Sequence, residues 1–295
     1  MKFKIFFLLF LLLLFVFLPF IPRTVKASGQ AEMAKLIQQI EILKREVFLL
    51  QTLLLSLQSQ QEITAQSYLA VNFSDNSVVL EKNPNQPYSI ASITKIMNAV
   101  IALENIDTDQ TITLTEKMLE PLGQSPSLFL GLSVSAENLL KASLIQSTND
   151  ASEALAYFVG KEKFVDLMNL KAKEINMTNT VFYDVHGLNP ANRSTATDLA
   201  KLLMYIYNNH PEILSIARDN NFWLPDSTGR LLKFQNVNNF YPLSAFIGGK
   251  TGYLPEAKQT LASIFNVNGD RVAIILLYSN NRQTDAFTIL KQLRN

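Results

Sequence analysis

The chain has 295 residues, a formal net charge of +1 and no cysteine. The near-zero charge excludes a nucleic-acid reader that depends on excess basic residues, and the absence of cysteine excludes disulfides, thiolate zinc sites and a cysteine nucleophile. Hydrophobic residues make up 48% of the chain and charged residues 17%. This balance indicates either a membrane protein or a soluble protein with an apolar appendage.

The N-terminal segment has the pattern of an export signal. Two lysines precede an unbroken apolar run over residues 5–18, and Ala27 is a suitable cleavage position after it. Residues 1–27 are therefore either a cleaved signal peptide or a retained anchor, in which case residues 5–22 associate with the membrane. Both alternatives predict an extracytoplasmic protein of the cell envelope, membrane-anchored or secreted.

A helical stalk is predicted over residues 30–61. Apolar residues recur there at alternating spacings of three and four, at Met33, Leu36, Ile40, Leu43, Val47, Leu50, Leu54 and Leu57. This is the a/d seam of a coiled coil, about four heptads long. It predicts a stalk that forms a homodimer through residues 33–57 or spaces the protein from the membrane. The alternative is a single amphipathic helix that lies on its own domain or on a lipid surface.

Residues 62–295 are long enough for one globular core. Strands are predicted at both ends of this part and helices between them, which indicates one sheet with a helical insertion. The predicted strands cover 68–73, 77–81, 259–267 and 271–278, with short strands and loops over 107–135, and the predicted helices cover 92–104, 136–146, 150–159, 162–175, 196–208 and 284–293.

Ser92 and Lys95 stand at the start of the first apolar helix of this part. Positions i and i+3 share a helical face, so the serine hydroxyl and the lysine amine can meet. A serine needs a base to become a nucleophile, and lysine is that base if burial or a neighbouring cation lowers its pKa. The pattern alone is weak, because an N-capping serine followed by an exposed lysine has the same spacing.

Two further short motifs occur later in the chain. Ser147-Thr-Asn149 follows a predicted helix and alone is typical of a helix cap. Lys250-Thr-Gly252 has glycines on both sides, which fits either an edge strand beside a ligand or a glycine-rich turn.

The three motifs together resemble those of penicillin-recognising serine enzymes. Their contexts resemble the serine-type D-alanyl-D-alanine carboxypeptidases, the low-molecular-weight penicillin-binding proteins, over about residues 66–280. The segments that carry the resemblance are Pro87-Tyr-Ser-Ile-Ala-Ser92-Ile-Thr-Lys95-Ile-Met97, Ser147-Thr-Asn-Asp-Ala-Ser-Glu-Ala-Leu-Ala156, Phe182-Tyr-Asp-Val-His-Gly-Leu188, Ser194-Thr-Ala-Thr-Asp-Leu199 and Gly249-Lys-Thr-Gly-Tyr253.

The resemblance implies an α/β (α+β) fold of the β-lactamase/transpeptidase type, with an antiparallel sheet flanked by helices and a helical subdomain. It implies a peptidase domain over 62–295 that acts on peptidoglycan stem peptides, binds β-lactams covalently and needs no metal or organic cofactor. The implied catalytic residues are Ser92, Lys95 and Ser147, and the implied substrate-binding residues are Asn149, Lys250, Thr251, Gly252 and Tyr253, with the backbone N–H groups of Ser92 and Tyr253 as the oxyanion hole.

Some positions depart from the family pattern without removing a reacting group. They are Thr148 in the second motif, Lys258 in Glu256-Ala-Lys258, and Asp184-Val185 before His-Gly-Leu. His186 is expected to shape a turn, His210 to end a surface helix and Trp223 to pack. The alternatives to a carboxypeptidase are a DD-endopeptidase that uses the same residues, a β-lactamase, for which a Glu-x-x-Leu-Asn segment is missing, and a non-catalytic envelope scaffold.

Overall fold

The computed structural model describes residues 30–57, 62–121, 127–226 and 228–294. The chain divides into two compact units, residues 1–51 and 52–295. The predicted leader, residues 1–27, lies outside the described residues. Among the residues that are described, no helix combines the length and the apolarity that crossing a membrane requires.

Helix α2 (Gln30–Leu57) confirms the predicted helix over the heptad positions. Several apolar side chains of its described part are exposed: Leu36 by 38%, Ile40 by 47% and Leu50 by 62%. In proteins most of the stability of a helix comes from packing of its apolar face, so these exposed side chains favour a partner for α2. The pairing of two such helices remains a prediction.

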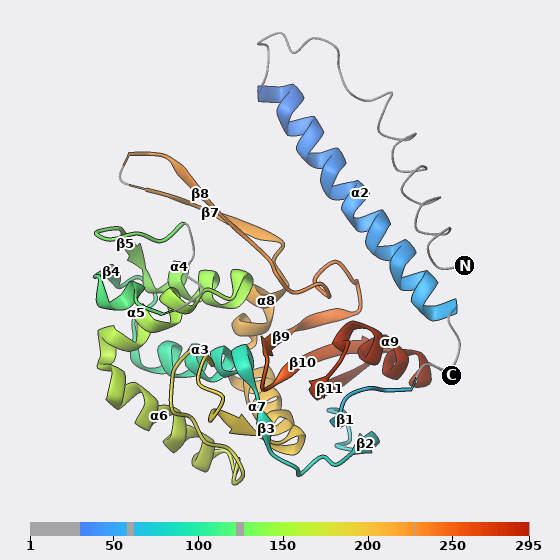
Figure 1. Ribbon diagram of the computed structural model, residues 1–295. Coiled ribbons are helices and arrows are strands. Elements are labelled where there is room, and N and C mark those ends of the chain that lie inside the picture. Colours follow the sequence, from blue (N-terminus) through green and yellow to red (C-terminus); the bar gives the residue numbers. More distant parts are fainter. Residues whose placement is uncertain (1–29, 58–61, 122–126, 227, 295) are drawn as a thin grey trace. The chain divides into compact units, whose positions relative to one another are not determined.

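A five-stranded sheet forms the centre of the second unit (Figure 1). Its strands are antiparallel and lie in the order β2 (Val78–Lys82), β1 (Ser67–Asn72), β11 (Asp270–Ser279), β10 (Lys258–Val267) and β9 (Phe246–Leu254). The predicted hairpin and the two predicted C-terminal strands are confirmed, and together they pair both ends of the domain in one antiparallel sheet.

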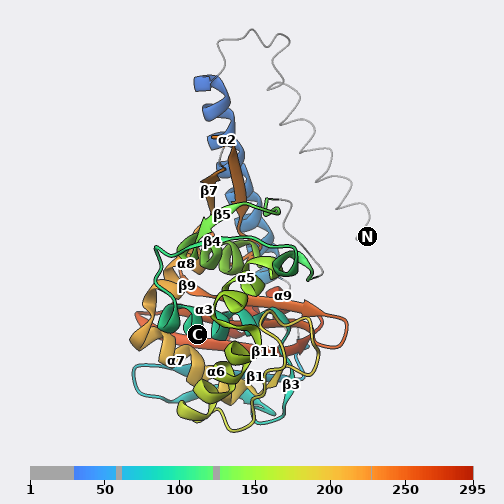
Figure 2. The ribbon, with the colours of Figure 1, turned by 90° about the vertical axis from the view of Figure 1, so that its left-hand side faces the viewer.

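The strands β10 and β11 are buried on both faces of the sheet, which explains the nearly continuous apolar run of the central strand β11. In β11, Ala273 and Ile275 belong to the larger core, which also contains Ile96 and Val100. Ile274 and Leu276 belong to a second core, on the other face, which is covered by α9 (Arg282–Gln292). Alternate residues of a strand point to opposite faces, so one strand supplies both cores. Leu199 and Leu203 of α7 (Ala196–Asn209) belong to the first of these cores, and Ile289 and Leu290 of α9 belong to the second. Figure 2 shows the domain after a turn of 90°.

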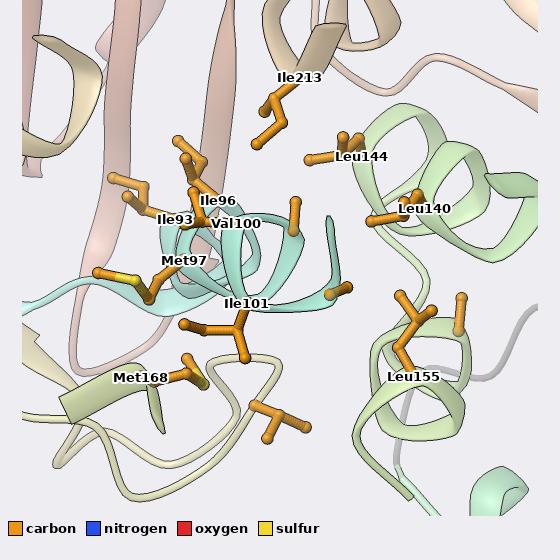
Figure 3. Close-up of a cluster of buried hydrophobic side chains, with 14 of the residues drawn as sticks. Ile93, Ile96, Met97, Val100, Ile101, Leu140, Leu144, Leu155, Met168 and Ile213 are labelled. Carbon is orange, nitrogen blue, oxygen red and sulfur yellow. The ribbon is translucent and has the colours of Figure 1, made fainter. Parts of the chain in front are cut away.

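Helix α3 (Thr94–Asn105) is the central helix of the domain. Every residue from Thr94 to Ala102 is buried, as expected of a helix surrounded by protein rather than one with a solvent face. Figure 3 shows Ile101 directed toward Met168, and Leu140, Leu144 and Leu155 on the neighbouring helices. The surrounding helices are α4 (Ala136–Lys141), α5 (Asn149–Val159), α6 (Lys161–Glu174) and α8 (Pro211–Arg218).

The remaining elements are short. Three small antiparallel pairs are β3 (Tyr88–Ser89) with β6 (Arg193–Ser194), β4 (Thr111–Thr113) with β5 (Ser133–Ser135), and β7 (Asn221–Pro225) with β8 (Leu231–Gln235). Three short turns are η2 (Ala91–Ile93), η3 (Lys117–Leu119) and η4 (Ala142–Gln146). The predicted short strands over 107–135 are confirmed, whereas α8 and the β7–β8 hairpin were not predicted.

Candidate active site

Ser92 and Lys95 lie on consecutive turns at the start of the central helix. Ser92 is in the 3-10 turn η2, and α3 begins at Thr94. Lys95 Nζ lies 3.2 Å from Ser92 Oγ, so the predicted meeting of the two side chains is confirmed. The capping alternative is wrong, because Ile93 is the N-cap residue of α3 and Lys95 is fully buried.

Two oxygen atoms hold the Lys95 amine from other directions. Asn149 Oδ1 and the backbone oxygen of His186 each lie 2.6 Å from Lys95 Nζ. Both oxygens can only accept hydrogen bonds, and a neutral amine has two N–H groups and one lone pair. When the two N–H groups are donated to these oxygens, the lone pair is left for the third partner, the Ser92 hydroxyl.

Burial tunes the basicity of Lys95. Loss of solvation lowers the pKa of Lys95 from 10.5 to about 7, although the charges of Asp184 and Asp150 act in the opposite direction. A large fraction of the amine is therefore neutral near pH 7. A base whose pKa lies near the working pH is suited to general-base catalysis.

Ser147 lies at the sharp turn between two helical segments. The π-helical turn η4 ends at Gln146, and Ser147 has the left-handed φ of 63°. Lys250 Nζ donates a hydrogen bond to Ser147 Oγ at 2.8 Å. Thr148 is the N-cap residue of α5, so the motif stands at a helix start as the cap alternative expected, but the Thr148 side chain makes no capping hydrogen bond.

The third motif lies on the edge strand β9, so the glycine-rich-turn alternative is wrong. Lys250 is 1% exposed, and its pKa is held well below 10.5, first by burial and then by the charges of Lys95 and Arg282.

The residues that follow Lys250 on β9 differ in exposure: Thr251 is 5% exposed and Tyr253 is 64% exposed. A Cβ atom on Gly252 would lie 2.8 Å from the backbone nitrogen of Ser92, so glycine permits the strand to approach Ser92 closely.

Arg282 was not predicted as part of this region. It is the first residue of α9, and its Nη1 donates a hydrogen bond of 2.7 Å to the backbone oxygen of Gly252. Its charge also acts on Lys250. No sequence motif marks this arginine, because the chain brings it to β9 only through the packing of α9 beside the sheet.

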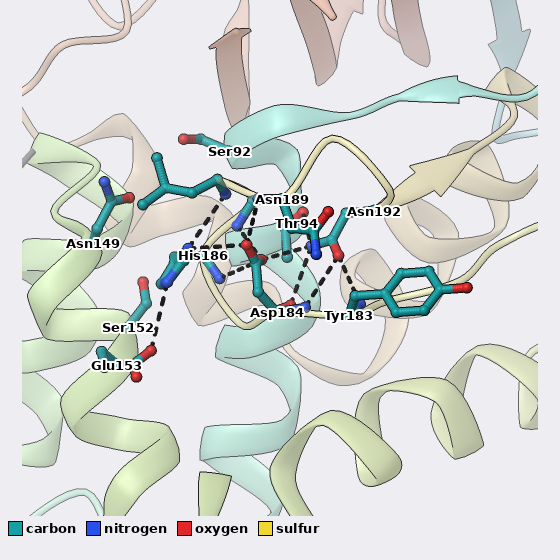
Figure 4. A network of polar contacts seen from close by, with 12 residues as sticks. Ser92, Thr94, Asn149, Ser152, Glu153, Tyr183, Asp184, His186, Asn189 and Asn192 are labelled. Carbon is teal, nitrogen blue, oxygen red and sulfur yellow. Dashed lines mark hydrogen bonds and ion pairs between the residues drawn. The ribbon is translucent and has the colours of Figure 1, made fainter. Parts of the chain in front are cut away.

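The turn over residues 184–189 supplies the His186 oxygen, and Figure 4 shows its network. Asp184 accepts hydrogen bonds of 2.6 Å from the backbone nitrogens of Gly187 and Asn189. Burial by itself raises the pKa of Asp184, but hydrogen bonds from His186 and from the turn outweigh it and hold the value at about 2. The turn predicted for His-Gly-Leu is present.

Three other predictions concern metal binding and two aromatic residues. Within the described part of the chain, no group of His, Cys, Asp or Glu side chains could hold a metal ion. His210 stands between α7 and α8, as predicted for a helix end. Trp223 is 50% exposed and has Lys233 Nζ 5.4 Å from its ring centre, so it packs less completely than predicted.

Comparison with known proteins identifies the family. The family model described as D-alanyl-D-alanine carboxypeptidase matches residues 55–281. The chain belongs to this family. It is 31% identical over 239 residues to a D-alanyl-D-alanine endopeptidase of Escherichia coli, which covers 77% of this chain and 75% of the relative. It is 33% identical over 242 residues to D-alanyl-D-alanine carboxypeptidase DacF of Bacillus subtilis, which covers 75% of this chain and 59% of the relative.

Solved structures of the family share the fold. A D-alanyl-D-alanine carboxypeptidase from Mycobacterium tuberculosis superposes with a TM-score of 0.72 at 25% identity, over 79% of this chain and 93% of that chain. A variant of a Streptomyces DD-transpeptidase gives a TM-score of 0.73 at 26% identity, over 80% of this chain and 99% of that chain. The antiparallel sheet flanked by helices expected from the sequence is therefore confirmed.

Proposed function

We propose that this protein is a serine-type D-Ala-D-Ala carboxypeptidase that removes the last residue from peptidoglycan stem peptides. The observation that carries the proposal is the setting of Lys95, a buried amine with a pKa of about 7 that lies 3.2 Å from the Ser92 hydroxyl. Membership of the D-alanyl-D-alanine carboxypeptidase family supplies the substrate class.

Acylation begins at this pair. Lys95 Nζ takes the proton of Ser92 Oγ as that oxygen attacks the carbonyl carbon between the two D-alanines. The carbonyl oxygen becomes an oxyanion, which the backbone N–H groups of Ser92 and Tyr253 stabilise. The closeness of Gly252 to the Ser92 nitrogen supports this pairing of turn and strand.

The leaving amine needs a proton when the peptide bond breaks. Ser147 Oγ gives its proton to that amine and receives in exchange the proton that Lys95 took from Ser92, so Lys95 is neutral again before deacylation. Lys250 stays protonated and orients the Ser147 hydroxyl through its hydrogen bond of 2.8 Å. Lys250 and Thr251 hold the terminal carboxylate of the substrate, as a cation and a hydroxyl beside one anion. Asn149 hydrogen-bonds the substrate backbone and, in addition, accepts from Lys95.

Deacylation completes the cycle. A water molecule gives a proton to Lys95 and attacks the ester, which releases the shortened peptide and restores the Ser92 hydroxyl. A β-lactam acylates Ser92 by the same route, with its ring amide in place of the peptide bond. We expect slow release of that product, and rapid turnover of a chromogenic cephalosporin would indicate a β-lactamase instead.

Release of D-alanine from a tripeptide that ends in D-Ala-D-Ala tests the proposal. The wild type should release it, and Ser92→Ala should not. Ser133→Ala is a matched control, because this exposed serine of β5 has only a hydroxyl partner on Thr113 in the described structure. Failure of the wild type to release D-alanine, or release by Ser92→Ala at the wild-type rate, would contradict the proposal.

An endopeptidase that cleaves peptide cross-links is the second candidate. The Escherichia coli relative named an endopeptidase matches this chain over 77% of its length. The same residues would perform either reaction, so the products must distinguish them. Incubation with purified muropeptides should shorten stem peptides by one D-alanine, whereas conversion of cross-linked dimers to monomers without loss of D-alanine would favour the endopeptidase.

The proposal also assigns roles to two N-terminal segments, the leader and α2, in an enzyme of the cell envelope. Residues 1–27 direct export, and α2 joins two copies through its exposed heptad positions. Sedimentation of the chain from residue 28 onward tests the second point. A dimer that becomes monomeric when Ile40 and Val47 are replaced by Asp supports a coiled coil, and a monomeric wild type contradicts it.

A further inference from the structure

Two carboxylates hold the imidazole ring of His186 from opposite sides. Nδ1 lies 3.3 Å from Asp184 Oδ2, and Nε2 lies 3.5 Å from Glu153 Oε2 (Figure 4). The Glu153 side chain is only 2% exposed. Burying a carboxylate is costly unless it is paired, and the reaction described above makes no use of Glu153.

The position of Glu153 on α5 links it to the second motif. Asn149 and Glu153 are four residues apart, so they lie on the same face of this helix. Asn149 accepts a hydrogen bond from Lys95 directly. Glu153 instead contacts the ring of His186, whose backbone oxygen is the other acceptor of Lys95. Both acceptors of the amine are therefore connected to the same helix face.

The two carboxylates come from different elements and have different partners. Asp184 belongs to the turn itself and accepts from Gly187 and Asn189, so it shapes the turn locally. Glu153 comes from α5, and its other oxygen pairs with Lys161 at the start of α6. This ion pair holds the Glu153 side chain in the orientation that contacts His186.

We propose that Glu153 is a positioning residue for acylation. By holding the His186 ring, it keeps the His186 backbone oxygen at Lys95 Nζ and so keeps the amine lone pair directed at Ser92. The inference rests on the proposed function, because it concerns the rate at which Ser92 is acylated. Small displacements of a reacting group cost large factors in rate, and a loose His186 oxygen would let the amine rotate.

The test is stopped-flow acylation by a fluorescent penicillin, which separates the dissociation constant of the first complex from the limiting acylation rate constant. Glu153→Ala should lower the rate constant by about ten- to a hundredfold and leave the dissociation constant unchanged. Glu153→Gln should retain most of the wild-type rate, because its amide has the size of the carboxylate and still places an oxygen beside Nε2, at the position where Oε2 now lies 3.5 Å away.

Leu155→Val is the matched control for stability. Leu155 lies on the same helix, is fully buried and belongs to the apolar core. This variant should lose thermal stability but keep the wild-type acylation rate constant. Wild-type acylation in Glu153→Ala, a Gln variant as slow as the Ala variant, or an equal loss in Leu155→Val would overturn the inference. A wild type that penicillin does not acylate at all would instead overturn the proposed function.

Discussion

Asn149 Oδ1 accepts a hydrogen bond of 2.6 Å from Lys95 Nζ, which joins the second motif to the lysine of the first. The resemblance to the family assigned Asn149 to the substrate. The structure adds a contact between Asn149 and the Lys95 amine, so a change at Asn149 should also affect the amine lone pair.

Replacement of Asn149 by Asp is expected to raise the pKa of Lys95. A carboxylate in place of the amide would stabilise the ammonium form, so acylation would begin to fall at a higher pH than in the wild type. The measurement is the pH profile of penicillin acylation. Asn149→Ala is the companion variant, since it removes the acceptor without adding a charge. An unchanged profile in Asn149→Asp would contradict the contact.

The wild-type profile itself should have an acidic limb near pH 7. Lys95, with a pKa of about 7, is protonated below that pH and loses the lone pair that accepts the Ser92 proton. The acylation rate constant should fall about tenfold for each pH unit well below it. A rate that stays level between pH 7 and pH 5 would show that Lys95 is not the base.

The same pKa has a consequence for stability. Between pH 7 and 10.5 the unfolded chain holds a proton on Lys95 that the folded protein has released, so the folded state gains stability as pH rises through this range. As pH rises from 7 to 10, the unfolding free energy of the wild type should therefore increase relative to that of Lys95→Met by a few kcal/mol. The increase is on the order of 1.4 kcal/mol per unit of pKa shift. Urea unfolding of both proteins from pH 7 to 10 measures this difference, and a difference independent of pH would be evidence against the low pKa.

Asp184 should contribute stability that disappears only in strong acid. Its pKa is about 2 in the folded protein against 3.8 ordinarily, so the contribution is present above pH 4 and is lost as pH falls toward 2. The shift corresponds to about 2 kcal/mol. Comparison of the wild type with Asp184→Asn by urea unfolding from pH 7 to 3 should show the two curves converging. Parallel curves would not fit this account.

Gly187 is expected to tolerate no side chain. Its φ is 90°, and a Cβ atom would lie 2.0 Å from the backbone oxygen of Ala91, next to Ser92. Gly187→Ala should lower stability by more than about 1 kcal/mol from backbone strain alone and should slow acylation by displacing the turn that bears Ser92. Gly229→Ala is the control, because Gly229 also has a positive φ, of 82°, but meets no atom within 4 Å. Equal acylation in both variants would contradict this role for the close approach.

Much of the fold could be predicted because its elements carry strong local patterns. The alternating strands at both ends and the apolar face that begins near Ser92 each follow one period closely. Helix α8 was missed because it is short and begins at Pro211 directly after another helix. The helix predicted over 136–146 is instead α4 followed by a π-helical turn, which sequence periodicity does not distinguish.

The parts of the site that lie within one short motif could be predicted from the sequence. The contacts that form only when distant segments pack together could not. Ser92 and Lys95 meet through helical spacing alone. Their link to the His186 backbone oxygen has no sequence signal, because any residue type supplies such an oxygen. The spacing of four residues places Glu153 on the same helical face as Asn149, which the sequence does show. Its contact with His186 depends on the packing of the 184–189 turn beside α5, which the sequence does not show.

The most direct measurement is intact-mass and peptide-mapping spectrometry after brief incubation with benzylpenicillin. The account predicts one covalent adduct, located on Ser92, in the wild type. It predicts no adduct in Ser92→Ala and a much slower one in Lys95→Met. An adduct on another residue, or labelling of Ser92→Ala equal to that of the wild type, would contradict the claim that Ser92 is the nucleophile.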